Sequence, residues 1–425
     1  MSILIKNVLL DGKERNIYIE GNQIEAISEA GSTKEAEFVI EGKDKAAIPG
    51  LFNAHTHAAM TLLRGYADDM PLQEWLETKI WPVEARLTED DVYWGTKLAC
   101  LEMIKTGTTF FNDMYWHWGG SSRAVAETGI RAALSAVFID GFNMEKSKEQ
   151  INRNKALYEA SKKLPARIIF ALGPHAIYTV SEESLCWTRD FAEKHDLLVH
   201  IHLSETAEEV EGCIKRYGMR PVEFLDSIDF LSPRTIACHC VHMNRKETEL
   251  LKKYDVKIVH NPTSNMKLAA GRRPYEELKE QGLYSNIALG TDGCASNNNL
   301  DMFEEMKIAS LLHKAFSGDP TSMPAKEAFE LATVNAAKMF RLNSGVIEEG
   351  KLADVVLLDL KKVELVPNHN LISNIVYSAN GSCVDTVICD GKILMDGRRV
   401  EGEEEIKSKV SEVAYELVKG DERKD

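Results

Sequence analysis

Cysteine is scarce in this chain: eight of its 425 residues are cysteine, and no two of them have the spacing of a Cys-x-x-Cys pair. A disulfide framework needs more thiols than this, so the composition indicates a reducing compartment. Long apolar runs are absent as well, and the segment from Met1 to Asn7 lacks a basic stretch followed by an apolar core. We therefore expect a cytoplasmic protein without a signal peptide or a membrane span.

Positive charge is also in short supply. The 51 lysines and arginines are outnumbered by 66 aspartates and glutamates, which gives a formal net charge of -15 at pH 7. A protein that binds nucleic acid needs a basic face to neutralise phosphates, so this charge argues against a nucleic-acid partner. The remaining composition, 44% hydrophobic and 28% charged residues, is ordinary for a globular protein.

The middle of the chain, from about residue 47 to 345, alternates short apolar runs with stretches of helical periodicity. This alternation is typical of repeated β-α units around a parallel sheet, and eight such runs suffice for a closed (β/α)8 barrel of the TIM type. The eight predicted strands are Ala46–Asn53, Thr108–Asn112, Arg131–Ile139, Arg167–Gly173, Leu197–Leu203, Thr235–His239, Val256–His260 and Ile287–Gly290. Both chain ends show short strands with polar turns instead, such as Asn16–Asn22 and Val384–Lys392.

Polar side chains that could carry chemistry stand where these predicted strands end. His55 and His57 close the first run, and alternate residues of a strand point to one face, so their imidazoles would converge. His202 closes the fifth run and Asp292 follows the eighth. A barrel gathers its strand ends on one rim, where these four side chains could hold one divalent ion. Such an ion lowers the pKa of a bound water to about 7 and supplies hydroxide near neutral pH.

Two further residues of this rim could move protons or polarise a substrate. Glu205 lies three residues after His202, and a carboxyl in a partly desolvated pocket can serve as a general acid. His239 closes the sixth run and could stabilise a tetrahedral intermediate. The fourth run is followed by Pro174-His175 and by no lysine that could bridge two ions, so a single ion is favoured.

The chain resembles the amidohydrolase superfamily, and within it the metal-dependent deaminases of the methylthioadenosine/S-adenosylhomocysteine and 5'-deoxyadenosine group. The resemblance spans nearly the whole chain. It is carried by residues 49–57, Trp81-Pro82-Val83-Glu84, Gly173-Pro174-His175, His202-Leu203-Ser204-Glu205-Thr206, His239-Cys240-Val241-His242, residues 260–265, Gly290-Thr291-Asp292-Gly293 and residues 350–354. It implies a small β-sandwich domain built from residues 1–48 and 346–425 with a terminal helix, a catalytic barrel over residues 49–345, and a homo-oligomer such as a tetramer.

The resemblance also assigns roles at the rim. The ion, zinc by first expectation and otherwise iron, manganese or nickel, would be held by His55, His57, His202 and Asp292. Asp292 would accept a proton from the attacking water, Glu205 would protonate N1 of the purine, and His239 would stabilise the developing charge. Hydroxide would then add to C6 and ammonia would leave. Glu84 matches a glutamate that holds the ribose hydroxyls, and His175 matches a histidine that contacts the substrate.

One segment departs from the relatives that favour S-adenosylhomocysteine. Those relatives place arginines after strand three to bind the amino-acid carboxylate, whereas residues 135–152 of this chain contain none. Its lysines lack the planar fork that holds a carboxylate at two points. A neutral 5' group is therefore favoured, in a pocket that we expect Phe138, Phe142 and Met144 to line.

Other functions stay open at this point. Triazine hydrolysis and the deamination of guanine or cytosine use the same barrel chemistry, because each adds hydroxide to an electron-poor ring carbon. A metal-free scaffold of the same fold is a further hypothesis, although this chain keeps every predicted ligand. The zinc cytidine deaminases that act on flipped bases are excluded, because their Pro-Cys-x-x-Cys signature is absent.

Overall fold

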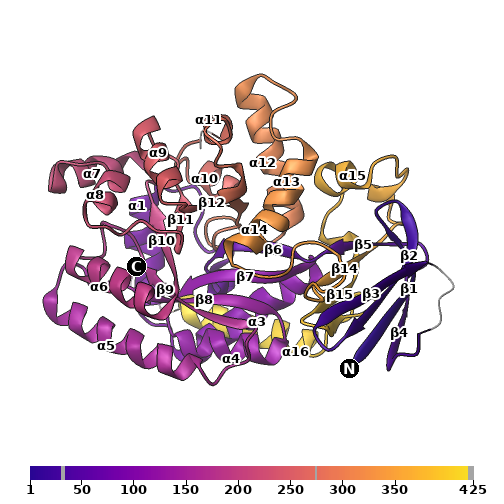
Figure 1. Cartoon of the computed structure of the whole chain (residues 1–425). Coiled ribbons are helices and arrows are strands. Elements are labelled where there is room, and N and C mark those ends of the chain that lie inside the picture. The colour runs from indigo at the N-terminus through magenta and orange to yellow at the C-terminus, as the bar shows by residue number, and fades with distance from the viewer. Residues whose placement is uncertain (30–33, 273–274, 420–425) are drawn as a thin grey trace.

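A computed structural model describes residues 1–29, 34–272 and 275–419. Its larger part is a barrel of eight strands that follow one another in sequence order, with every neighbouring pair parallel (Figure 1). The strands are β6 (Leu51–Thr56), β7 (Thr108–Tyr115), β8 (Arg131–Phe138), β9 (Ile168–Pro174), β10 (Leu198–Leu203), β11 (Thr235–His239), β12 (Lys257–His260) and β13 (Ile287–Leu289). The predicted (β/α)8 barrel is confirmed.

The small domain takes its strands from both ends of the chain. They are β1 (Ser2–Leu10), β2 (Lys13–Glu20), β3 (Gln23–Glu29), β4 (Phe38–Glu41), β5 (Lys45–Pro49), β14 (Val355–Asp359), β15 (Val384–Cys389) and β16 (Lys392–Met395). β1 pairs with β2, β4 and β5, so the hydrogen bonds form one branched, mixed sheet that encloses a core of aliphatic side chains. The composite domain predicted from the two chain ends is confirmed in this form.

The first predicted strand, Ala46–Asn53, turns out to be two strands in two different sheets. β5 pairs with β14 in the small domain, and β6 begins the barrel directly after Gly50. A Cβ atom at Gly50 would lie 2.0 Å from Oγ1 of Thr109, so a side chain cannot be accommodated where the chain passes from one sheet to the other. The apolar run correctly indicated strand structure, but it did not indicate that the chain changes its pairing partner at Gly50.

Helices surround the barrel and return the chain from the rim to the next strand. They are α3 (Glu89–Lys105), α4 (Trp118–Thr128), α5 (Met144–Ser161), α6 (Glu182–His195), α7 (Ala207–Tyr217), α8 (Pro221–Ser227), α9 (Arg245–Lys253), α10 (Pro262–Lys267), α11 (Tyr275–Glu280), α12 (Met302–Ser317), α13 (Ala325–Leu331) and α14 (Val334–Met339). Several begin at a polar side chain that accepts a first-turn N–H, as Ser181 does for α6 and Thr206 for α7. These caps fix where each rim loop ends.

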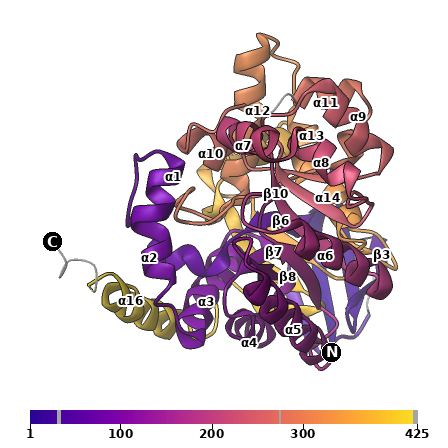
Figure 2. The same cartoon turned by 90° about the vertical axis from the view of Figure 1, so that its left-hand side faces the viewer.

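The remaining elements are short segments and one long terminal helix. They are η1 (Ala58–Leu63), α1 (Leu72–Trp75), η2 (Leu76–Ile80), α2 (Trp81–Glu84), η3 (Tyr284–Asn286), η4 (Val363–Leu365), α15 (Leu371–Tyr377), η5 (Gly381–Cys383) and the terminal helix α16 (Glu403–Lys419). α16 lies beside α3 (Figure 2), and its Ile406 and Val410 are buried in one cluster with Trp75 and Ile80. The expected terminal helix therefore packs on the segment that follows β6. Residues 420–425 lie outside the described part.

A buried group of charges joins the barrel to the small domain. Arg131, at the start of β8, donates to both carboxylate oxygens of Asp354 at 3.2 and 3.3 Å and to Asp390 at 2.9 Å. Asp354 also accepts the backbone N–H of Asp390 at 2.8 Å and the hydroxyl of Ser344 at 3.0 Å. A buried charge is tolerated when it is paired and hydrogen-bonded in this way.

Within the described residues, no helix has both the length and the apolar character needed to cross a membrane. All eight cysteines lie in the described part of the chain, and no disulfide forms between them.

Candidate active site

The seam between the first and last barrel strands brings two predicted ligands together. The backbone N–H of Asp292 donates to the carbonyl of His55 at 3.0 Å, and the hydroxyl of Thr56 donates to the carbonyl of Asp292 at 2.9 Å. A Cβ atom at Gly290 would lie 2.7 Å from the backbone nitrogen of His55, so glycine is needed for this close approach. Residues 237 positions apart in the sequence thus become neighbours.

His57 and His202 face each other in a way that neutral imidazoles avoid unless a cation lies between them. Nδ1 of His57 donates to the carbonyl of Met114 at 2.6 Å, and Nδ1 of His202 donates to the carbonyl of His175 at 2.9 Å. Each ring therefore has its lone pair on Nε2, and these two Nε2 atoms are only 3.2 Å apart. Burial and the neighbouring histidines hold the pKa of His202 well below its usual range, so this ring carries no second proton.

His55 and Asp292 complete the same constellation. Nε2 of His55 is buried and has no hydrogen-bond partner among the described residues. The Nε2 atoms of His55 and His57 both lie 3.3 Å from Oδ1 of Asp292. Ligand atoms about 2.0–2.2 Å from a tetrahedral ion are about 3.3–3.6 Å apart. The contacts of His55 and His57 with Asp292, and of His57 with His202, are close to the separations expected for ligands of one divalent ion.

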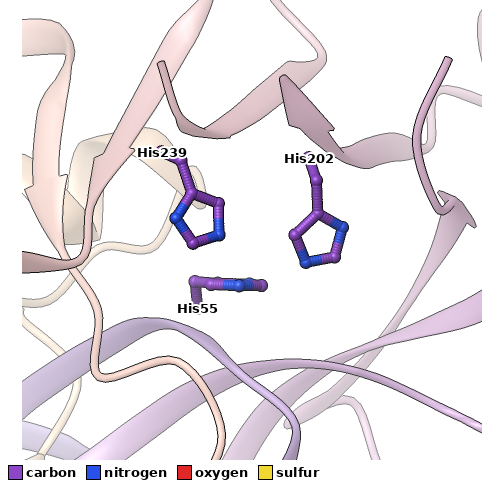
Figure 3. A group of neighbouring side chains, drawn as sticks. All are labelled: His55, His202 and His239. Carbon is purple, nitrogen blue, oxygen red and sulfur yellow. The ribbon is translucent and has the colours of Figure 1, made fainter. Parts of the chain in front are cut away.

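His239 is a fifth group at this point. Its ligand atom lies within 4.8 Å of those of His55 and His202, and Figure 3 shows the three rings turned toward one another. Nδ1 of His239 donates to Oδ1 of Asn265 at 2.8 Å, which leaves Nε2 facing the shared space. His239 can therefore act on an ion or on a substrate oxygen held there.

Neighbouring histidines keep Asp292 ionised in spite of its burial. Burial alone would raise the pKa of its carboxyl, but contact with His55 and the charges of His55 and His57 hold it well below the usual range. Oδ2 accepts the hydroxyls of Ser264 at 2.7 Å and Ser296 at 3.0 Å. Asp292 has a φ of 62°, so the backbone at the end of β13 adopts a left-handed conformation that directs this carboxylate to the histidines.

Glu205 lies beside the histidines and is held by a second glutamate. Burial raises the pKa of Glu205, whose carboxylate is 3.7 Å from Nδ1 of His239. The carboxylate of Glu209 accepts the backbone N–H groups of Ser204 at 2.8 Å and Glu205 at 2.9 Å. In the sequence Glu209 reads as an ordinary acidic residue in the first turn of α7. Its part in fixing the Glu205 loop is visible only in the tertiary structure.

The cavity above these groups has one apolar wall. The short helices after β6 contribute Leu72, Trp75, Leu76 and Trp81 to its lining. Glu84 lines it too: burial raises the pKa of its carboxyl, which accepts the indole N–H of Trp116 at 3.3 Å. His175 lines it beside His202, with the two ring centroids 4.7 Å apart, and burial lowers its pKa to about 3, so it is neutral at every physiological pH. The structure thus places all eight predicted site residues in or around one cavity.

The prediction that Phe138, Phe142 and Met144 line the pocket for the 5' group is wrong, because none of the three lines the cavity. Val137 and Ile139 line the cavity, whereas Phe138 points the other way and packs against Trp187 at a centroid distance of 5.9 Å. Phe142 and Met144 are 37% and 65% exposed. Successive residues of a strand alternate between its faces, and here both faces are apolar, so the sequence could not tell which side is the cavity.

An arginine reaches this region from a distant part of the sequence. The guanidinium of Arg216, near the end of α7, lies 3.7 Å from the ring centroid of Phe142. Arg216 also lines a small neighbouring cavity that shares Tyr178 with the main one. The sequence argument, which considered only the segment after the third strand, missed this cation.

Comparison with known proteins places this barrel and its metal-binding rim in a family. Residues 46–394 match the amidohydrolase family, and the chain belongs to it. It is 50% identical to the 5'-deoxyadenosine deaminase of Methanoregula boonei, over 98% of this chain and 96% of that protein. It is 49% identical to the 5-methylthioadenosine/S-adenosylhomocysteine deaminase 1 of Archaeoglobus fulgidus, over 98% of each chain. An adenosine deaminase from Xanthomonas campestris, solved with bound zinc, aligns with a TM-score of 0.92 at 34% identity over 98% of each chain.

Proposed function

We propose that this protein is a hydrolytic deaminase that converts the adenine of 5'-modified adenosines, such as 5'-deoxyadenosine and 5'-methylthioadenosine, to hypoxanthine and releases ammonia. One observation carries the proposal. Nε2 of His57 lies 3.2 Å from Nε2 of His202, and the Nε2 atoms of His55 and His57 each lie 3.3 Å from the ionised carboxylate of Asp292. Beside them lies Glu205, whose pKa is raised by burial. A site for a divalent ion next to a proton donor fits water attack on a ring carbon with departure of an amine.

The ion would be held by His55, His57, His202 and Asp292, with zinc as our first choice. When bound, it would lower the pKa of a water to about 7 and so make a hydroxide nucleophile available near neutral pH. The chain supplies the rest of the chemistry. The Asp292 carboxylate takes one proton from the water, and the Glu205 carboxyl donates its proton to N1 as the oxygen adds to C6. Asp292 then passes its proton to the departing amine, which leaves as ammonia, and Glu205 recovers a proton from the new hydroxyl.

Burial of Glu205 and the histidines around Asp292 set these proton positions. The raised pKa of Glu205 keeps a larger share of it protonated toward neutral pH, as a general acid requires. The lowered pKa of Asp292 keeps that carboxylate ready to accept. We assign to His239 the stabilisation of charge on the attacking oxygen, because its Nδ1 is fixed by Asn265 and its other nitrogen faces the site.

Substrate contacts follow from the cavity lining. Glu84 accepts the ribose hydroxyls, and neutral His175, whose Nδ1 lies 3.0 Å from the hydroxyl of Thr179, makes a hydrogen bond to the nucleoside. Val137 and Ile139 favour a small apolar 5' group. Arg216, beyond Tyr178, is the one cation we assign to a longer 5' group ending in a carboxylate, as in S-adenosylhomocysteine.

Replacement of Glu205 tests the reaction. We expect Glu205→Gln to lower turnover of 5'-deoxyadenosine by about 10²–10⁴-fold, because a general acid contributes about that much, while the bound ion is retained. Glu208→Gln is the matched control, since Glu208 is exposed in the first turn of α7, three residues after Glu205. Turnover is followed by the ultraviolet change from adenine to hypoxanthine, and the ion by elemental analysis. Near-normal turnover of Glu205→Gln would contradict the assigned role.

A substrate panel separates this function from its alternatives. We expect 5'-deoxyadenosine, methylthioadenosine and S-adenosylhomocysteine to be deaminated, with Glu84→Ala raising KM for each, and guanine and triazines to be poor substrates. Arg216→Ala should lower kcat/KM for S-adenosylhomocysteine alone. A preference for guanine that survives Glu84→Ala would instead favour a nucleobase deaminase.

Three further assignments belong to this proposal. They are one ion per subunit, a cytoplasmic homo-oligomer such as a tetramer, and division of the chain into residues 1–48, 49–345 and 346–425. The absence of disulfides among the cysteines of the described chain supports the compartment. Light scattering on the purified protein measures the subunit number, and elemental analysis the ion content.

A further inference from the structure

A buried polar cluster lies deeper in the barrel than the metal-binding rim. His200 is its centre, two residues before His202 on β10, so both side chains point into the barrel and His200 lies one layer lower. Nε2 of His200 is 2.8 Å from Nδ1 of His55 and 3.0 Å from Sγ of Cys238. Its Nδ1 is 3.1 Å from the hydroxyl of Ser135 and 3.2 Å from Nδ2 of Asn112.

His55 differs from the other histidine ligands in what holds it. His57 and His202 donate Nδ1–H to backbone carbonyls, which can only accept, so their tautomer is fixed. The partner of His55 is an imidazole, which can accept or donate. The position of the proton on His55, and with it the availability of Nε2 for an ion, therefore depends on His200.

The hydrogen bonds around His200 can run in two directions. In one, Nδ2 of Asn112 donates to Nδ1 of His200, His200 donates to His55, and the Nε2 proton of His55 points toward Asp292. In the other, His55 donates to His200, His200 donates to Ser135, and the hydroxyl of Ser135 donates to Oδ1 of Asn112 at 3.5 Å. The first direction places a proton where an ion would bind. Only the second leaves the lone pair of His55 Nε2 facing that space.

We propose that His200 is a positioning residue: it accepts Nδ1–H of His55 and thereby fixes the ring and tautomer in which Nε2 can bind the ion. Ser135 takes the remaining proton of His200, and Nδ2 of Asn112 is anchored on the carbonyl of Ala54 at 3.0 Å, directly before His55. Partners of metal-binding histidines typically contribute 10- to 100-fold to metal affinity. This inference rests on the proposed metal centre and deepens it.

The distances exclude a second ion shared by His55, His200 and Cys238. Two nitrogens on one tetrahedral ion are about 3.3 Å apart, and a nitrogen and a thiolate sulfur are about 3.6 Å apart. The observed separations of 2.8 and 3.0 Å are shorter than both and fit hydrogen bonds.

Two substitutions of His200 test the role. Leucine removes the acceptor, whereas the side-chain oxygen of glutamine can reach the place of Nε2 and accept from His55. The matched control is His313→Gln, because His313 is equally buried and has Nε2 3.1 Å from that of His260, a histidine outside the metal-binding set. Full-length proteins are loaded with zinc or cobalt(II), and metal affinity is measured by competition with a chelator. The cobalt(II) absorption spectrum reports the ligand geometry.

We expect His200→Leu to weaken metal affinity by about 10- to 100-fold and to alter the cobalt spectrum, with His200→Gln and His313→Gln within about threefold of the unaltered protein. Affinity unchanged in His200→Leu, or lost equally in His200→Gln, would overturn the inference. If His200→Leu does not fold, Ser135→Ala is the deciding variant, because it removes only the hydrogen bond to Nδ1 of His200. Weaker metal binding in Ser135→Ala supports the positioning role of His200, and unchanged metal binding refutes it. Failure of the unaltered protein to bind one ion would instead refute the proposed metal centre.

Discussion

Two regions of this barrel that contain buried ionisable groups arrange them in opposite ways. Where the barrel meets the small domain, Arg131 donates to Asp354 and Asp390, so positive and negative groups are matched inside the protein. At the rim, imidazole nitrogens with lone pairs face one another and a single carboxylate. The junction is complete with protein atoms alone, whereas the rim is complete only with a cation. Buried groups that lack complementary partners therefore indicate a ligand.

The backbone does not share this contrast, because both regions contain left-handed non-glycine residues: Asp390 at the junction has a φ of 51°. Non-glycine residues with positive φ stand at several strand ends of the rim, as at Ser204 with 51°, His239 with 68° and Asp292 with 62°. Such conformations are costly and persist where surrounding contacts enforce them. Around Ser204 those contacts come from Glu209, which accepts two consecutive backbone N–H groups. In both regions hydrogen bonds hold strained residues in place, since at the junction Asp354 accepts the backbone N–H of Asp390.

Removing the carboxylate of the rim should have the largest effect. We expect Asp292→Asn to bind the ion weakly and to lose about 10³-fold or more in turnover, because a metal ligand and a proton acceptor are lost together. Asp301→Asn is the control: Asp301 is half-buried and nearby in the chain, but its carboxylate accepts the N–H groups of Phe303 and Gly381 outside the cavity. Elemental analysis and steady-state kinetics measure both variants. Full activity in Asp292→Asn would show that the rim does not need this carboxylate.

Breaking the junction should destabilise the protein without changing the metal site. Arg131→Met leaves Asp354 buried and without its cation, which typically costs 3–5 kcal/mol. Arg123→Met is the matched surface control, because the Arg123–Asp90 pair is exposed and such pairs contribute about 0–1 kcal/mol. Urea unfolding measures stability, and chelator competition measures the ion. A loss of metal affinity in Arg131→Met would mean that the two regions are coupled.

The smallest effect concerns Glu209 and depends on pH. Burial raises the pKa of Glu209 from 4.5 to about 7, so the folded protein holds this proton more tightly than the unfolded chain. Its contribution to stability is therefore fully present below about pH 4.5 and is lost as the pH rises toward 7.

Glu209→Gln removes this titration and leaves one backbone N–H without its acceptor, which typically costs 1–3 kcal/mol. The stability advantage of the unaltered protein over the variant should be larger at pH 5 than at pH 7.5 when urea midpoints are compared. Glu208→Gln, on the exposed side of the same turn, should show no such change. An advantage independent of pH would contradict the raised pKa.

Much of this molecule could be predicted from the sequence because local patterns report local structure. Alternating apolar and amphipathic segments gave all eight barrel strands, and the sequence pattern, together with the family resemblance, placed the predicted site residues that now surround one cavity. A strand that is apolar on both faces does not show in its sequence which face lines the cavity. For this reason Phe138 was predicted in the cavity in place of Val137. Gly50 shows the same limit, since nothing in the apolar run around it indicates the passage between two sheets.

The sequence by itself determined the barrel strands and the candidate metal-binding residues, which rest on local patterns, while the resemblance carried by its linear motifs indicated the family and the composite small domain. Tertiary structure alone decided the contacts between segments far apart in the chain. It placed Arg216 over Phe142, hydrogen-bonded Glu209 to the Glu205 loop, and put His200 beneath His55. The physical reason is that a hydrogen bond or an ion pair depends on the distance between two atoms in space, which closure of the barrel sets and sequence separation does not.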